Sequence, residues 1–381
     1  MLRIEFLHIE SDSSGLLRCY VVREGNAREL TIQLPNRVQP APDLIALALS
    51  TLAGRHFKEI RIDVPLSTND IALIESFTNA TVEAPHAERL IRDFGSSHVL
   101  SFSGGLDSLA ALALVPISAR LISVDFGGRF ARERPFFSQF EPYIVETNLV
   151  QLGLNRNHWS FMLVGVILLR DELDIGTYSF GAILGQNLRS VLSGVYNQRS
   201  TTLPLLQHVG VSQMNPVAGL TEVGTALLAA RTRPGAIKAS VASLAKPGEE
   251  KAFRKATLIE AISERHNLHF PPPPTPPVRP WFSWGDYPAT DLSSLYVLKV
   301  LGRDRLDHSY VGGIPDYVID AVPGLDLEFY ERVNPDAYQG LTVREIGNLC
   351  GRMSRYGIGV WRQRDWQEAH QVQQLIDSAS E

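Results

Sequence analysis

Residues 103–108, Ser-Gly-Gly-Leu-Asp-Ser, have the composition of a phosphate-binding loop. Two glycines let the backbone approach an anion closely, and a helix that starts there would aim its amide groups and its dipole at that anion. The serine hydroxyls would add donors. An acidic residue in such a loop would repel phosphate, so Asp107 is best explained if it organises the loop amides or holds a magnesium ion. The stretch predicts binding of a metal-bound nucleotide.

The elements on either side of this stretch suit such a loop. Residues 99–102 are a short apolar run typical of a buried strand, and the Ala- and Leu-rich residues 109–115 favour a helix. Further strands are predicted at 120–126 and 143–147, and this alternation indicates parallel βαβ units. The simpler alternative is a glycine turn between a strand and a helix, with Asp107 as a capping residue.

The hexapeptide resembles the SGGxDS signature of the PP-loop ATP pyrophosphatases, which adenylate a substrate and release pyrophosphate. The resemblance implies a doubly wound α/β domain that binds ATP and Mg²⁺, with Asp107 near the metal. The cofactor-binding residues that we infer from the signature and from the end of the next strand are Ser101, Ser103, Gly104, Gly105, Leu106, Asp107, Ser108, Asp125, Phe126 and Gly127. The catalytic candidates are Ser103, Asp107, Ser108, Arg129 and Arg132.

Residues 125–133, Asp-Phe-Gly-Gly-Arg-Phe-Ala-Arg-Glu, are similar to the DYGQRHxxE stretch of 7-cyano-7-deazaguanine synthases. Gly128 and Phe130 stand where that family has glutamine and histidine, and the family's zinc-binding cysteine cluster has no counterpart here. The chain therefore resembles a divergent branch of these synthases.

On physical grounds, Asp125 at the carboxyl end of a parallel strand would meet a ribose or base. Arg129, Arg132 and Arg134 could stabilise charge on the α-phosphate. The alternative is a charged, solvated helix start in which Glu133 pairs with an arginine.

The expected fold is α/β, a doubly wound parallel sheet of PP-loop type with a small N-terminal α/β domain and a helical C-terminal region. We expect three parts: 1–92, 93–270 and 271–381. Strands are predicted near 2–9, 18–23, 29–34 and 59–64, and a helix at 42–53. Residues 150–265 are expected to be mainly helical, and the proline-rich residues 271–280 to be a stiff connector.

Composition limits the remaining classes of function. The 36 Lys and Arg against 41 Asp and Glu leave a formal charge of −5, so nucleic acid is not expected as a partner. Two distant cysteines, Cys19 and Cys350, cannot build a disulfide framework or a four-thiolate zinc site. No run is long enough to cross a membrane, and charge near the N-terminus argues against a signal peptide. We expect a cytoplasmic protein without a membrane partner, and a homodimer is compatible with the sequence.

Three further groups have weaker signals. The spacing of His266 and His269 suits a metal pair. The favoured interpretation is that both lie at the C-terminal end of a helix, where the helix dipole favours positive charge. The basic residues Lys251, Arg254 and Lys255 are expected on a solvated helix face, with phosphate contact as the alternative. Aromatic residues 281–287 could stack a base, yet aromatics beside prolines more often anchor a linker to the core.

These observations predict an ATP-dependent ligase that adenylates a carboxylate, such as a 7-deazaguanine carboxylic acid, for attack by ammonia or an amine of a small molecule or protein. One alternative is a PP-loop enzyme that modifies a tRNA base. Another is a module that binds ATP or AMP without chemistry, in a defence or biosynthetic operon.

Overall fold

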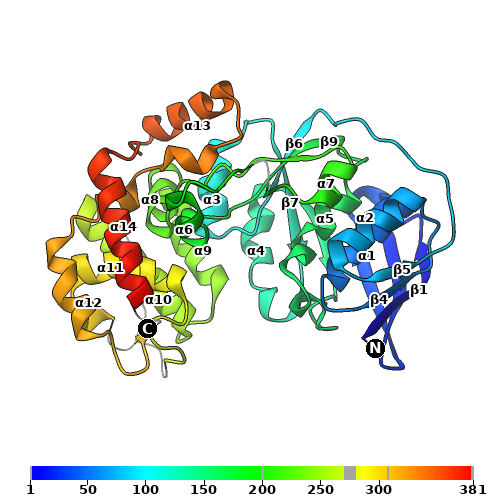
Figure 1. Ribbon diagram of the computed structural model, residues 1–381, viewed down its shortest axis with the longest axis horizontal. Coiled ribbons are helices and arrows are strands. Elements are labelled where there is room, and N and C mark those ends of the chain that lie inside the picture. Colours follow the sequence, from blue (N-terminus) through cyan, green and yellow to red (C-terminus); the bar gives the residue numbers. More distant parts are fainter. Residues whose placement is uncertain (1, 199–200, 270–279, 307–308, 379–381) are drawn as a thin grey trace. The chain divides into compact units, whose positions relative to one another are not determined.

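The computed structural model describes residues 2–198, 201–269, 280–306 and 309–378. Its contacts divide the chain into two compact units, and each is described by itself (Figure 1). The sheet unit comprises residues 1–103, 116–179 and 200–214. The helical unit comprises residues 104–115, 180–199 and 215–381.

The strands of the sheet unit form one ten-stranded sheet, with the order β10-β9-β6-β7-β8-β3-β2-β1-β4-β5 among the described residues. The strands are β1 (Arg3–Ser11), β2 (Leu16–Arg23), β3 (Asn26–Gln33), β4 (Glu59–Ile62), β5 (Thr81–Glu83), β6 (Ser97–Ser101), β7 (Arg120–Asp125), β8 (Tyr143–Thr147), β9 (Ile175–Ser179) and β10 (Ser212–Gln213). Strands β8, β7, β6, β9 and β10 are parallel neighbours, as are β1, β4 and β5. Only β1–β2, β2–β3 and β3–β8 are antiparallel pairs. The fold is therefore α/β with a mostly parallel sheet, as the sequence predicts.

The N-terminal strands belong to this same sheet. Strand β3 pairs with β8 through Ile32 opposite Thr147, so the first 90 or so residues extend the sheet that contains β6 and β7. The expected parts 1–92, 93–270 and 271–381 do not coincide with the two units. Strand pairing joins residues 1–92 to the strands of the part 93–270, and the rest of that part packs in the helical unit.

Helices of the sheet unit lie beside its strands (Figure 1). They are α1 (Pro42–Ala53), α2 (Thr68–Thr78), α4 (Arg134–Phe137), α5 (Val164–Leu168) and α7 (Pro204–His208). Helix α1 has the predicted bounds, and Ser67 and Asp70 form the capping box of α2.

Residues 159–170 form no continuous helix, contrary to expectation. A 3₁₀ helix, Trp159–Leu163, precedes the short α5, which lies close to the sheet at Gly165. A Cβ there would come within 3.2 Å of the methyl groups of Ile122 and Val124. Strands β9 and β10 also lie within the range expected to be helical. The sequence of β9 indicates a strand only weakly, because Gly176 interrupts its apolar pattern.

The helical unit contains the expected helices after residue 250 and several shorter ones. Its helices are α3 (Leu106–Leu114), α6 (Leu188–Leu192), α8 (Glu222–Thr232), α9 (Ile237–Leu244), α10 (Glu250–His266), α11 (Pro288–Leu301), α12 (Asp316–Ala321), α13 (Val343–Arg355) and α14 (Gln363–Asp377). Helix α3 packs along α8, and α10 packs on α9 and α11. The expected proline connector falls largely on 270–279, outside the described residues.

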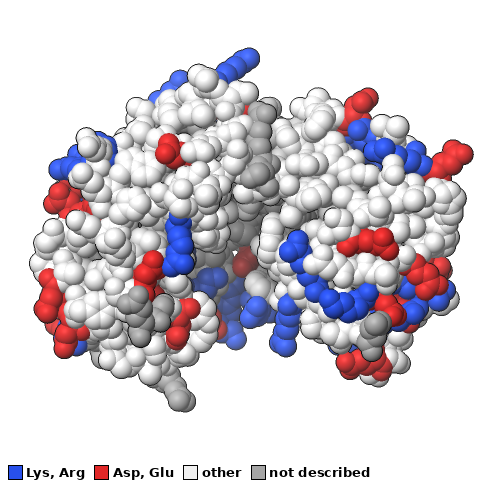
Figure 2. All heavy atoms as spheres, in the orientation of Figure 1, with Lys and Arg blue, Asp and Glu red and all other residues white. Residues whose placement is uncertain are grey.

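None of the described helices is long and apolar enough to cross a lipid bilayer. On the face shown in Figure 2, both basic and acidic side chains occur on each unit.

Candidate nucleotide-binding site

The Ser-Gly-Gly-Leu-Asp-Ser stretch connects a buried strand to a helix, as predicted. Strand β6 has fully buried Val99 and Leu100 at its centre and ends at Ser101, and α3 begins at Leu106 with Gly105 as its N-cap. The chain passes from the sheet unit to the helical unit between Ser103 and Gly104.

Hydrogen bonds within the helical unit hold the loop. The Ser240 hydroxyl, fully buried on α9, donates to the Gly104 carbonyl at 2.7 Å. The Ser108 hydroxyl donates to the Gly105 carbonyl at 2.9 Å, so its proton is used inside the loop. Amides at the start of a helix have no acceptor within the helix itself, which makes such an end suited to an anion. Gly104 to Ser108 thus lead into a helix N-terminus, and phosphate binding there stays a prediction.

The two glycines of the loop have different conformations, which gives a test. Gly104 has φ +80°, in the region that disfavours any Cβ, whereas Gly105 has φ −67° and ψ 163°, which every residue adopts. We expect Gly104→Ala to weaken ATP binding by about tenfold or more and Gly105→Ala to weaken it less, as measured by calorimetry. Equal affinities of the two variants would contradict the role of the Gly104 conformation.

Asp107 directs its carboxylate into the interior of the helical unit. The Thr225 hydroxyl, buried on α8, donates to Asp107 Oδ1 at 2.5 Å. Next to this pair, Lys255 of α10 forms a buried ion pair with Glu222 of α8. A Cβ on Gly181 would lie 3.2 Å from the Asp107 Cβ, so a larger residue there would displace the start of α3. These contacts fix the orientation of Asp107.

Asp107, Glu222, Arg254 and Lys255 form a cluster of charges in which the carboxylates are unevenly compensated. Burial disfavours the Glu222 carboxylate, but Lys255 and Arg254 outweigh that effect and lower its pKa to about 2. Burial likewise disfavours the Lys255 ammonium, and the carboxylates of Glu222 and Asp107 more than offset it and raise the pKa of Lys255. Burial raises the pKa of Asp107, and repulsion by Glu222 adds to it while Lys255 opposes it. Asp107 is therefore the carboxylate of the cluster with the least compensated charge.

The donor set around Asp107 suits only one kind of metal binding. Among the described residues, no group of three or more His, Cys, Asp and Glu side chains is placed to hold a metal ion. The nearby Glu222 carboxylate is occupied by Lys255 and Arg254. One protein carboxylate is nevertheless enough for a magnesium ion that arrives with nucleotide phosphates and keeps several waters. Asp107 fits that role.

In the sheet unit, Asp125 lies at the carboxyl end of β7, where the sequence places it. Its Oδ1 accepts the Gly127 amide at 2.9 Å, and its Oδ2 accepts Arg134 Nη1 at 2.9 Å. Arg134 also donates to Glu146 of β8 at 2.6 Å, so it bridges the ends of two parallel strands. These carboxylates raise the pKa of Arg134 and keep it charged. Arg134 is thus engaged by protein carboxylates, which differs from its expected role at phosphate.

The other predicted residues of this stretch differ in exposure. Phe126 is buried and its ring lies 5.3 Å from that of Phe161, so the side chain serves packing. Arg129 is exposed with its guanidinium 4.7 Å from the Phe130 ring, and Arg132 is half-buried. Of the arginines, Arg129 is the one presented to solvent.

Of the weaker sequence interpretations, the one for Lys255 needs correction and the one for His266 agrees with the structure. Lys255 is buried in an ion pair, so the expected solvated face is wrong for it, although Lys251 is exposed. His266 lies 3.2 Å from a Glu331 oxygen at the end of α10, a contact that agrees with the interpretation as a helix-end residue.

Aromatic residues after the prolines are divided between core and surface. Phe282 and Trp284 are buried and pack against Tyr310, as expected for an anchor to the core. Trp281 and Tyr287 are exposed, with ring centres 5.6 Å apart.

The sequence did not predict the residues that contact the loop: Gly181, Glu222 and Thr225 near Asp107, and Ser240 at the Gly104 carbonyl. One signal was present, since Glu222 is the only charge in the otherwise apolar or small stretch 216–230. A carboxylate inside such a stretch predicts a buried partner.

Comparisons with protein-family models, curated proteins and solved structures find no match to this chain. The family resemblance therefore depends on residues 103–108 and 125–133 together with the strand–loop–helix geometry.

Proposed function

We propose that the chain is an ATP-dependent adenylating ligase of the PP-loop type, with the doubly wound arrangement of that superfamily. The observation that carries this proposal is the Ser-Gly-Gly-Leu-Asp-Ser loop itself. It follows a buried parallel strand, has a left-handed glycine at Gly104 and begins the nine-residue helix α3. A phosphate loop of this kind needs these three features together.

The proposed reaction has two steps. A carboxylate oxygen of the substrate attacks the α-phosphorus of ATP, the bond from that phosphorus to the bridging oxygen breaks, and pyrophosphate leaves. An amine nitrogen then attacks the acyl carbon, AMP leaves with the bonding electrons, and the amine loses a proton to solvent. Backbone amides of the loop would stabilise the phosphate charge. Magnesium bound with ATP would neutralise charge on the phosphates, with Asp107 as its protein ligand.

The resemblance of residues 125–133 suggests a 7-deazaguanine carboxylic acid as the substrate. Since Gly128 and Phe130 replace the family's glutamine and histidine, we propose that activation is retained and that the acyl group ends as an amide on an amine. An amide needs one activation, whereas a nitrile requires a second activation of the amide oxygen.

The stoichiometry of ATP use tests this proposal. With a 7-deazaguanine carboxylic acid, an amine, ATP and Mg²⁺, we expect one AMP and one pyrophosphate for each amide, measured by chromatography and mass spectrometry. Two ATP consumed for each nitrile would contradict the altered acceptor. Absence of ATP consumption with any such acid would exclude the substrate class.

A nucleotide-binding module without chemistry is the second candidate, and one observation favours it. The Asp107 carboxylate already accepts a hydrogen bond from Thr225 and lies near Lys255, so it has a structural role inside the helical unit. In that case calorimetry would detect ATP binding, but no acid would release pyrophosphate.

A further inference from the structure

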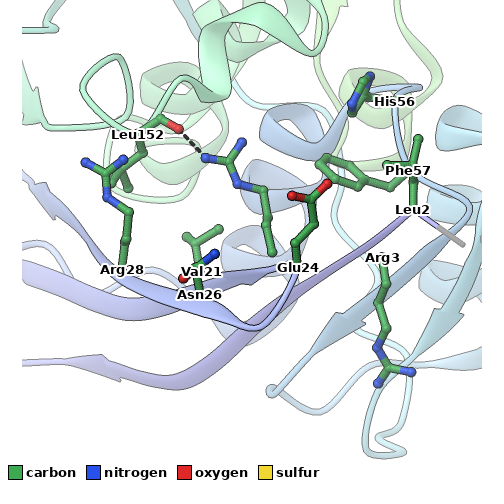
Figure 3. Close-up of a pocket in the computed structure, with 10 residues that line it drawn as sticks. Leu2, Arg3, Val21, Glu24, Asn26, Arg28, His56, Phe57 and Leu152 are labelled. Carbon is green, nitrogen blue, oxygen red and sulfur yellow. Dashed lines mark hydrogen bonds between the residues drawn. The ribbon is translucent and has the colours of Figure 1, made fainter.

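A pocket of about 260 Å³ opens in the sheet unit at the turn between β2 and β3 (Figure 3). Its apolar part is formed by Leu2, which is exposed, and by the buried Val21, Phe57 and Leu152. Since β3 runs antiparallel to β8, this turn extends beyond the carboxyl end of β8. No residue of the 103–108 loop lines the pocket, so it is a separate site.

Two arginines in the pocket are held by backbone carbonyls of one turn. Arg23 donates to the Leu152 carbonyl, and Arg28 Nη2 donates to the Gln151 carbonyl at 3.2 Å. A guanidinium has five N–H donors in a fixed plane, so a carbonyl contact orients it and leaves donors for a carboxylate. Arg3 is different, because it pairs with Glu5, Glu59 and Glu83 and points away from the other lining residues in Figure 3.

Glu24 supplies the opposite charge from an unusual backbone conformation. It has φ +51°, Gly25 has φ +77°, and the two form the two-residue turn between β2 and β3. Such hairpin turns favour Asn-Gly, and a glutamate is disfavoured at the first position. Figure 3 shows its carboxylate directed toward Phe57. The turn geometry therefore does not explain this residue, whereas a ligand with a cationic group would.

We propose that this pocket binds a free α-amino acid with an apolar side chain. Its carboxylate would meet the arginines and its ammonium Glu24. Its side chain would lie against Leu2 and the parts of Phe57 and Leu152 that face the pocket. The pocket volume of about 260 Å³ is far more than one water molecule needs, and a molecule of this size suits it. A phosphate dianion suits it less, because Glu24 would repel it. The inference does not depend on the proposed adenylation.

Calorimetry on the full chain with four probes tests the ligand class. L-Leucine should bind, while 4-methylpentanoate lacks the ammonium, 3-methylbutylamine lacks the carboxylate, and inorganic phosphate is the dianion. We expect each of the last three to bind at least about tenfold more weakly than leucine. No leucine binding, or equal binding of any of the other three, would overturn the proposal.

Variants locate the site. Glu24→Asn places the favoured residue in the turn, so the protein should fold at least as well while leucine affinity falls by about tenfold or more. Arg28→Met should cause a similar loss, and Arg18→Met is the matched control, because Arg18 is an exposed residue of β2 that does not line the pocket. Unchanged leucine affinity in both pocket variants would place the binding elsewhere and refute the assignment. Pyrophosphate release in these variants reports on the proposed adenylation separately.

Discussion

Asp107→Asn should lower the rate of pyrophosphate release at least about 100-fold while the protein stays folded. The amide oxygen can still accept the hydrogen bond from Thr225, so the contact between α3 and α8 persists. What disappears is the negative charge that would bind magnesium on the nucleotide phosphates. Initial rates of pyrophosphate release at saturating ATP and Mg²⁺ give the measurement.

A second buried aspartate of the helical unit provides the control for Asp107→Asn. Asp291 is fully buried on α11 and accepts the Tyr310 hydroxyl at 2.9 Å, but it is no part of the loop. Asp291→Asn should therefore keep pyrophosphate release within a few-fold of the wild-type rate. If Asp107→Asn also kept the wild-type rate, the assignment of Asp107 as the residue that binds magnesium would fail.

The sequence was informative where a single local pattern determines the structure. Alternation of apolar residues in the first 34 residues predicts β1 to β3, and the glycine pair after an apolar run predicts the turn from β6 into α3. The position of Asp125 at the sheet edge could be predicted, because it ends a strand rich in β-branched residues. That strand, β7, pairs in parallel with β6 and β8, the strands before and after it in the chain.

The pattern was insufficient where contacts distant in sequence decide the outcome. Asp107 lies 118 residues before Thr225, and no local signal pairs an aspartate of a loop with a threonine of another helix. Lys255 has the spacing of a surface residue on an amphipathic helix, and only the packing of α10 against α8 shows that it is buried. The single sheet could not be foreseen either, since the pairing of β3 with β8 joins segments more than 100 residues apart.

Glu222→Gln should be the variant with the largest effect on stability, because it leaves the buried Lys255 without the carboxylate of its ion pair, whereas Arg254 keeps Glu250. Loss of one member of a buried ion pair costs about 3–5 kcal/mol. The pKa of Glu222 falls from 4.5 to about 2 on folding, so its ionisation stabilises the folded chain. That shift corresponds to about 3 kcal/mol, the same order as the mutational cost.

The sign of the shift fixes the pH range of the effect. Because folding lowers the pKa, the contribution of Glu222 is fully present above pH 4.5 and is lost as the pH falls toward 2. Urea unfolding of both proteins, followed by circular dichroism, should show their free energies of unfolding differing most at neutral pH and converging toward pH 2. A difference that stays constant over this range would mean that Glu222 acts through packing and not through its charge.

Glu328→Gln tests whether burial or ion pairing alone causes the loss of stability expected for Glu222→Gln. Glu328 also has its pKa lowered to about 2, by Arg362 first, but its side chain is 35% exposed. Solvent screens such a pair, so we expect a loss of at most about 1 kcal/mol in the free energy of unfolding.

Lys255→Met offers an independent check of the buried pair. Combined with Glu222→Gln, it removes the unpaired ammonium and should recover part of the lost stability, because the two residues act as a unit. Additive losses in the double variant would show that the pair is not coupled, and the cluster around Asp107 would then be held by Thr225 alone.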